Sequence, residues 1–356
     1  MRLPTIVGKH KSEILMFLGL VAFILYLWLF VGIGSLLDLI GKLNAEQYSL
    51  YFSIAILALV LSVFFDSLIW HSLLRGLNVK LKLRKVILYN WIGNFVEMVI
   101  PCETVCGEAT RIYLSTKETN ENAGISAAPV ITSRILSTFV YTGGLLIASA
   151  VLIATKRMSV FLLGTLLLVL IGTIGVIGAI IYLALRESAE ERLVSLIMVL
   201  VKIVTKNPAK QEEQKEKLRL SLYSFGEAFR TYRKSPRLLV KPMIYAIIAW
   251  FFMLSVYLMV FFSLNFTSIS LIDLAVVYCI SSTVETLTAG FPVGAVEITM
   301  ISVYAALGVP LVVAGAATTF TRLLTFWVQI IIGYPILQFT ELKEVLKKGF
   351  STTFYS

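Results

Sequence analysis

Long apolar windows set the strongest limit on what this chain can fold into. Six of them reach the length of about 20 mostly apolar residues that a helix needs to cross a bilayer, and they cover residues 14–34, 48–74, 125–154, 159–185, 242–264 and 311–335. Only 15% of the residues are charged, against about 25% in soluble domains. Because helices satisfy their own backbone hydrogen bonds in lipid, the sequence predicts one all-α polytopic membrane domain over residues 1–356, with about six transmembrane helices.

Two shorter windows, residues 86–100 and 271–289, have a different character. Each carries one carboxylate, Glu97 or Glu285, and runs into a Pro- or Gly-containing segment with a second carboxylate, Glu108 or Glu297. Short, interrupted polar helices occur at membrane depth only where protein or a wet cavity surrounds them. The sequence therefore predicts two re-entrant helical hairpins. Two ordinary additional spans, which would give eight in total, remain the alternative.

Glycine and proline mark the turns of the predicted hairpins, since they permit a sharp backbone reversal and close approach to a headgroup. Short helices that begin at such turns would aim unpaired N–H groups at an anion such as a phosphate. The turn residues predicted on this basis are Pro101, Gly107, Gly290, Pro292 and Gly294.

Two arginines, Arg134 and Arg322, lie in the middle of apolar windows and within nearly matching segments, Ser-Arg-Ile-Leu-Ser-Thr-Phe-Val and Thr-Arg-Leu-Leu-Thr-Phe-Trp-Val. A guanidinium near the bilayer centre costs roughly 2.5 to 3.5 kcal/mol on insertion scales. Each arginine follows the second carboxylate of its hairpin by a similar interval, 26 residues after Glu108 and 25 after Glu297. This pattern predicts a duplicated membrane site.

The duplication divides the chain into repeat unit 1, residues 48–155, and repeat unit 2, residues 240–337. Two complete predicted spans separate the two arginine helices, so these helices are expected to point in opposite directions. That arrangement is an inverted-topology repeat, which builds transport sites near the membrane midplane. A single extra crossing between the arginine helices would make them parallel and remove the inversion.

Each arginine is expected to meet a glutamate or an anionic ligand, because a low dielectric strengthens the attraction that must offset desolvation of both ions. Glu108 and Arg111 are three residues apart and share one helix face. The predicted substrate-binding residues are Glu108, Arg111, Arg134, Glu297, Arg322, Asn94, Glu97 and Glu285.

Structural roles remain open for several of these residues. Arg134 and Arg322 would serve equally well as ion pairs that lock helices together, and the two hairpin carboxylates Glu97 and Glu285 would also be stable facing water. Asn94 fits either a cavity wall or an interhelical hydrogen bond. Asp66 is interpreted first as a hydrogen-bonded helix contact, with a proton carrier as the second interpretation.

The distribution of basic residues predicts the topology. Of the 31 lysines and arginines, 26 fall in segments predicted to be cytoplasmic and three in outer segments, as the positive-inside rule requires. The sequence thus predicts a multi-pass cell-membrane protein with both termini in the cytoplasm. Residues 187–241 resemble interfacial helices on the cytoplasmic leaflet. Basic loops facing anionic headgroups account for the net charge of +10, so no nucleic-acid partner is expected.

Soluble enzyme motifs are not found. The sequence contains no GxxxxGK[ST] phosphate loop, and its two histidines, His10 and His71, are far apart, so no cofactor or metal site and no soluble enzyme activity is expected. An intramembrane lipid-modifying enzyme with Glu108 or Glu297 as base is the last-ranked alternative, because no nucleophile or metal site accompanies these residues. A disulfide between Cys102 and Cys106 has no support from the sequence, because the predicted inner side is usually reducing.

Short motifs in both halves form a recognisable set: Gly93-Asn-Phe95, Pro101 and Gly107-Glu-Ala-Thr-Arg111, then Gly294-Ala-Val-Glu297, Gly308-Val-Pro310 and Arg322-Leu-Leu-Thr-Phe-Trp327. Over residues 14–337 the chain resembles the flippase-like transmembrane family, which includes the membrane region of lysylphosphatidylglycerol synthases and many uncharacterised bacterial and archaeal proteins. The resemblance implies transbilayer movement of a lipid, with aminoacylated phospholipids in the synthases and polyprenyl-linked sugars in archaeal relatives. It also implies that the path is lined by Glu108, Arg111, Arg134, Glu297 and Arg322.

Two departures from the family pattern limit how much of the family's activity can be expected of this chain. Gly290-Phe-Pro-Val-Gly294 replaces the Pro-Gly-Gly-x-Gly that relatives often carry, and only about 20 residues follow the last window, so no synthase catalytic domain or fused glycosyltransferase is expected. The expected function is movement of an anionic phospholipid or a polyprenyl-phosphate-linked lipid between leaflets. The alternative is a non-transporting accessory subunit that scaffolds a separate membrane glycosyltransferase or lipid-modifying enzyme.

Overall fold

The computed structural model describes residues 43–99, 103–155, 160–185, 208–287 and 292–338, together with isolated positions between 24 and 41. Every regular element in this part of the chain is a helix. In chain order the helices are α4 (Ala45–Gly76), α5 (Leu83–Val99), α6 (Glu103–Thr119), α7 (Ala123–Ala154), α8 (Val160–Leu185), α10 (Pro208–Lys234), α11 (Arg237–Ser263), α12 (Leu271–Leu287), α13 (Pro292–Ala306), α14 (Leu311–Arg322), the π-helix η2 (Leu323–Val328) and α15 (Gln329–Gln338).

Four helical rods in the described residues are long and apolar enough to cross a membrane: α4, α7, α11 and the continuous helix over residues 311–338 formed by α14, η2 and α15. Helix α8 is a further long apolar helix of 26 residues. The helices predicted for the five long windows after residue 48 are therefore confirmed. The window 14–34 lies largely outside the described residues.

The two short windows form helices α5 and α12, of 17 residues each. At 1.5 Å per residue such a helix is about 25 Å long, less than the roughly 30 Å thickness of a bilayer core. Each packs against the helix that follows it, α5 on α6 and α12 on α13. The described chain thus contains two helix pairs at the predicted positions.

Left-handed residues bracket both pairs. Asn78 and Asn120, with φ of 61° and 55°, precede α5 and follow α6, whereas Asn265 and Gly308, with φ of 58° and 89°, precede α12 and follow α13. Asparagine and glycine adopt this conformation most readily, and it reverses the chain direction in a few residues. Both helix pairs are therefore delimited by the same local chemistry.

The predicted turn residues have mixed outcomes. Gly107 lies inside α6 and not at a turn. Its lack of a side chain lets α6 approach α5 closely, since a Cβ at this position would lie only 2.7 Å from the Gly93 carbonyl oxygen on α5. Pro292 is the first residue of α13, where the missing N–H costs nothing, and Gly294 has a φ of 97°. Pro101 and Gly290 lie outside the described residues.

Helices α4 and α11 pack along their length and, with α12, α13 and α14, enclose the largest apolar core, which includes Leu59, Phe261 and Tyr304. The rings of Phe261 and Tyr304 meet at a centroid distance of 5.0 Å. A second cluster joins α5 and α6 to α15 and contains Ile92, Phe95 and Leu337. The hairpin pairs are therefore held by packing against the long helices.

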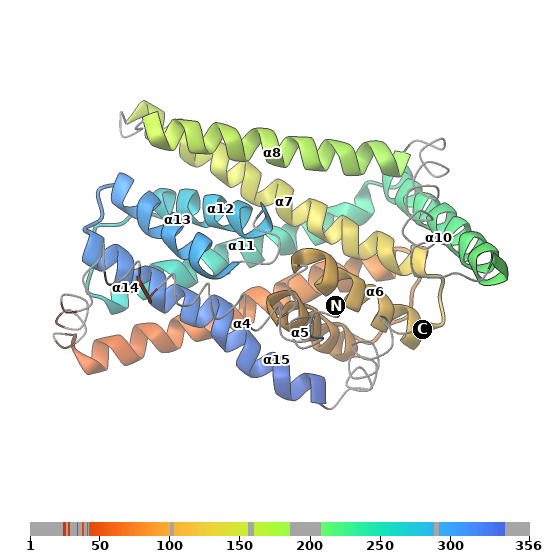
Figure 1. Ribbon diagram of the computed structural model, residues 1–356, viewed down its shortest axis with the longest axis horizontal. Helices are drawn as coiled ribbons and strands as arrows, with labels where there is room; N and C mark the ends of the chain where they lie inside the picture. The colour runs from red at the N-terminus through yellow and green to blue at the C-terminus, as the bar shows by residue number, and fades with distance from the viewer. Residues whose placement is uncertain are drawn as a thin grey trace, which may run out of the picture.

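The long helices lie side by side across Figure 1, with α5 and α6 towards the end of the molecule where α10 lies and with α12 and α13 towards the opposite end. Helix α7 and the α14–α15 rod run in opposite directions across this view (Figure 1).

The charged helix α10 packs on α7, and its buried Tyr232 donates a hydrogen bond to the Leu73 carbonyl oxygen at 2.9 Å. Burial raises the pKa of Tyr232, so this hydroxyl stays a donor. Residues 187–207 of the predicted interfacial segment lie outside the described residues.

Candidate functional site

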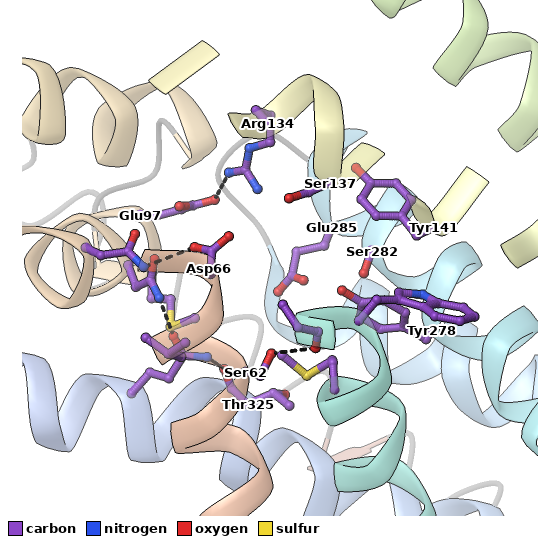
Figure 2. A pocket seen from close by; sticks show the side chains of 18 of the residues that line it. Ser62, Asp66, Glu97, Arg134, Ser137, Tyr141, Tyr278, Ser282, Glu285 and Thr325 are labelled. Carbon is purple, nitrogen blue, oxygen red and sulfur yellow. Dashed lines mark hydrogen bonds and ion pairs between the residues drawn. The ribbon is translucent and has the colours of Figure 1, made fainter. Parts of the chain in front are cut away.

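A cavity of about 260 Å³ lies among α4, α5, α6, α7, α11, α12 and the α14–α15 rod. Its wall combines carboxylates, guanidinium groups and hydroxyls with the rings of Trp70, Trp250 and Tyr257. Figure 2 shows side chains from several of these helices pointing into the same space. Of the predicted substrate-binding residues, the cavity wall includes Asn94, Glu97, Glu108, Arg111, Arg134, Glu285 and Arg322.

The first arginine cluster consists of Glu97, Glu108, Arg111 and Arg134. Arg134 on α7 donates from Nε to Glu108 Oε1 at 2.8 Å and from Nη2 to Glu97 Oε1 at 2.9 Å. Arg111 Nη2 donates to Asn94 Oδ1 and lies 3.6 Å from Glu97 Oε2. The long helix α7 is therefore tied to both helices of the first pair.

The second arginine cluster consists of Glu285, Glu297 and Arg322. Arg322 donates from Nε to Glu297 Oε1 at 2.8 Å and from Nη1 to Glu285 Oε1 at 2.9 Å. The Gly294 N–H donates to the other oxygen of Glu297 at 2.6 Å, so the left-handed glycine at the start of α13 orients this carboxylate. Glu297 is not part of the cavity wall and reaches the cavity only through Arg322.

The two clusters repeat the same contacts at nearly the same sequence separations. Each arginine lies 37 residues after the first carboxylate of its helix pair, and 26 or 25 residues after the second. In both clusters Nε pairs with the second carboxylate and a terminal nitrogen pairs with the first. The expectation that each arginine meets glutamate is thus confirmed, and these ion pairs also join helices.

The clusters differ in exposure and composition. The Arg134 side chain is 41% exposed, whereas that of Arg322 is 6% exposed and that of Glu297 is 4% exposed. Arg111 has no counterpart in the second cluster, because the residue three positions after Glu297 is Met300. The guanidinium of Arg322 instead lies 4.9 Å from the ring centroid of Phe326, a cation–π geometry.

One polar contact that the sequence did not reveal links the two halves of the chain. Asn94 Nδ2 donates to Gln329 Oε1 at 3.1 Å, and Gln329 Nε2 donates to the Thr325 carbonyl oxygen at 2.8 Å. Gln329 follows Arg322 by seven residues, a spacing that would place both on one face of a regular α-helix and was the available sequence signal. Between them lies the π-helix η2, a form of helix often found at functional sites.

Asp66 and Asn90 also line the cavity. Asn90 Nδ2 donates to Asp66 Oδ2 at 3.0 Å and to Ser67 Oγ at 3.1 Å, which confirms Asp66 as a hydrogen-bonded contact between α4 and α5. Its position on the cavity wall was not predicted, because no sequence pattern links Asp66 to the two arginine helices.

Several buried donors on the cavity wall have no hydrogen-bond partner among the described residues. They include Arg322 Nη2, Arg111 Nε and the indole nitrogens of Trp70 and Trp250. A buried donor without an acceptor costs about 1 to 3 kcal/mol, and more when it is charged. These donor atoms are themselves buried beside the cavity, so an acceptor oxygen would reach them only after the surrounding side chains shift.

The sequence left the state of Cys102 and Cys106 open. In the structure Cys106 is disulfide-bonded, although the side of the membrane predicted for it is usually reducing. Cys102 lies outside the described residues. Cys279 is a free, buried thiol that donates to the Tyr141 carbonyl oxygen at 3.2 Å. The described residues contain no group of three or more histidines, cysteines or carboxylates that could hold a metal ion.

Comparison with known proteins assigns the chain to a family. The sequence model of the family described as the lysylphosphatidylglycerol synthase TM region matches residues 16–333. Similar relatives are the UPF0104 membrane protein PH1989 of Pyrococcus horikoshii, 25% identical over 91% of this chain and 95% of the relative, and a UPF0104 membrane protein of Methanothermobacter thermautotrophicus, 26% identical over 90% and 92%. The UPF0104 membrane protein MJ1595 of Methanocaldococcus jannaschii is 23% identical over 95% of this chain and 98% of the relative. The chain therefore belongs to the family of the lysylphosphatidylglycerol synthase TM region and is an α-helical, multi-pass membrane protein.

Proposed function

We propose that the protein binds the headgroup of an anionic lipid in the cavity between the two arginine clusters and moves that lipid between the leaflets of the membrane. The observation that carries the proposal is Arg322, a 6% exposed guanidinium on the cavity wall whose Nη2 has no acceptor among the described residues. A phosphate oxygen is a suitable acceptor, because charge-assisted hydrogen bonds to guanidinium are among the strongest in proteins. The lipid is an anionic phospholipid or a polyprenyl-phosphate-linked lipid.

The helix arrangement supports transport through an inverted-topology repeat. Helices α5 and α6 would form a re-entrant hairpin from the cytoplasmic side, and α12 and α13 one from the outside, with both chain termini in the cytoplasm. The opposite directions of α7 and the α14–α15 rod, and the opposite ends at which the two helix pairs lie, agree with this arrangement (Figure 1). Substrate sites of such repeats lie at the interface between the repeats, where this cavity draws on residues of both.

The chemistry of the cavity favours binding over conversion. Its four glutamates, counting Glu297 behind the wall, each contact a guanidinium nitrogen at 2.8 or 2.9 Å. Carboxylates held in this way orient the arginines beside the cavity. Any chemical modification of the lipid would then come from a separate glycosyltransferase or lipid-modifying enzyme, consistent with a family named after the membrane region of a lipid synthase.

Reconstituted vesicles test the proposal. We expect NBD-labelled phosphatidylglycerol to cross vesicles that contain the protein faster than empty vesicles, as measured by dithionite quenching of the label that remains in the outer leaflet. Arg322→Gln and Arg134→Gln should each abolish the difference, because each removes the arginine that contacts two glutamates of its cluster.

Arg233→Gln on the exposed surface of α10 is the matched control, and it should transport like the wild type. Folding of every variant is checked by size-exclusion chromatography before reconstitution. Normal transport by both arginine variants would mean that the clusters are structural. If the wild-type protein moves lipid no faster than empty vesicles, the accessory-scaffold alternative replaces transport.

A further inference from the structure

The cavity carries more negative than positive charge. Three arginines and four carboxylates lie on the described wall, and Glu297 lies directly behind Arg322. No lysine or histidine is among the described residues that line it. With all groups ionised, the site has a formal excess of two negative charges. An anionic headgroup would raise this excess to three, which is costly where the surroundings screen charge less than water does.

One carboxylate differs from the others. Each glutamate of the two arginine clusters holds a guanidinium at 2.8 or 2.9 Å, so protonating it would break an ion pair. Asp66 has no ion-pair partner among the described residues and accepts only the 3.0 Å hydrogen bond from Asn90. A protonated Asp66 would keep that bond, since its carbonyl oxygen remains an acceptor. Asp66 is therefore the carboxylate of this site whose neutralisation disrupts least.

Asp66 shares the cavity with basic, acidic and tyrosine side chains from six other helices. On its own helix, His71 follows five residues later. The titratable and charged groups that line the cavity on the other helices are Glu97 on α5, Glu108 and Arg111 on α6, Arg134 and Tyr141 on α7, Tyr257 on α11, Tyr278 and Glu285 on α12, and Arg322 on α14. The arginines among them are already neutralised by the glutamates that they contact. The excess of two negative charges therefore comes from Asp66, which contacts no arginine, and from the second arginine cluster, where Glu285 and Glu297 share Arg322.

We propose that Asp66 takes up one proton when the anionic headgroup enters the cavity and releases it when the headgroup leaves. The proton comes from the water on the side from which the lipid enters, bonds to a carboxylate oxygen of Asp66, and returns to water on the other side. One negative charge and one proton then cross together, so the cycle is electroneutral and is driven by a pH gradient. This inference rests on the proposed function, because it assumes an anionic ligand.

Lipid distribution under imposed gradients tests this coupling. In vesicles of phosphatidylcholine and phosphatidylglycerol, NBD-labelled phosphatidylglycerol should accumulate in the leaflet facing the alkaline side. One-to-one coupling makes a gradient of one pH unit equivalent to about a tenfold ratio between the leaflets. A potassium diffusion potential without a pH gradient should leave the distribution even.

Asp66→Asn should show no accumulation of label under the pH gradient, because the amide has no proton to exchange. Glu227→Gln, an exposed carboxylate on α10, is the control and should accumulate label like the wild type. If the wild-type protein equilibrates the label but ignores the pH gradient, or follows a sodium gradient instead, the proton inference is overturned while lipid transport stands.

A binding experiment separates this inference from transport. Soluble dihexanoyl phosphatidylglycerol is added to wild-type protein in detergent and weak buffer, and proton uptake is followed with a pH-indicator dye. We expect about one proton per bound lipid, which supports the inference even if no lipid crosses vesicles and the proposed transport fails. Binding without proton uptake overturns the inference. This measurement needs only the wild-type protein, so it stands even if Asp66→Asn does not fold.

Discussion

At the scale of single residues, Arg134 and Arg322 occupy equivalent positions in the two repeat units but differ in how deeply they are buried. Arg322 and its partner Glu297 are 6% and 4% exposed, whereas Arg134 is 41% exposed. Removing one member of a buried pair costs about 3 to 5 kcal/mol, and the loss is smaller where one partner is partly exposed. We therefore expect Arg322→Gln to lower the free energy of unfolding more than Arg134→Gln does. Chemical unfolding in a mild detergent, followed by tryptophan fluorescence, measures the difference.

The double variant Arg322→Gln with Glu297→Gln serves as the control for this prediction. It removes the uncompensated buried carboxylate and should recover part of the lost stability. Equal losses from the two arginine substitutions would show that the difference in exposure does not govern their energetics.

At the scale of elements, the first helix pair depends on close contact between α5 and α6. A Cβ on Gly107 would lie 2.7 Å from the Gly93 carbonyl oxygen and 2.9 Å from Glu97 Cβ. We expect Gly107→Ala to lower the melting temperature by several degrees and to slow lipid transport, because it displaces the helix that carries Glu97. Small residues are the usual means of bringing two membrane helices this close.

Gly143→Ala on α7 is the matched control, since no atom lies within 4 Å of its added Cβ. Alanine in a helix interior is favoured over glycine by roughly 0.5 to 1 kcal/mol, so this variant should be neutral or slightly more stable. Thermal unfolding in detergent compares the two substitutions. An unchanged melting temperature for Gly107→Ala would mean that the helix pair is loosely packed.

At the scale of the whole molecule, the proposed hairpins determine which loops share a side of the membrane. Lys80 and Lys117 flank the first helix pair, and Thr267 and Leu311 flank the second; all four are exposed. We expect single cysteines at the first two positions to react with a membrane-impermeant maleimide only from the cytoplasmic side, and those at the last two only from the outside. The three native cysteines are replaced beforehand. Opposite sides for Lys80→Cys and Lys117→Cys would favour eight spans.

The sequence by itself determined the long apolar helices, the two short helix pairs and the contact of each arginine with glutamate. These features are local or repeated: apolar length decides which segments suit a bilayer, and equal spacings in two related segments produce equal contacts. The prediction of Gly107 as a turn residue was wrong, because composition alone does not distinguish a glycine that reverses the chain from one that lets two helices touch.

Only the tertiary structure decided which side chains share the cavity and how deeply each is buried. Gln329 meets Asn94 across 235 residues of sequence, and Asp66 joins the wall although no pattern tied it to the arginines. The spacing of residues along a helix sets which face they occupy, but the faces that meet depend on how the helices pack. For the same reason, two clusters with the same contacts in sequence differ in exposure, since the helices around Arg322 enclose it and those around Arg134 leave it partly open.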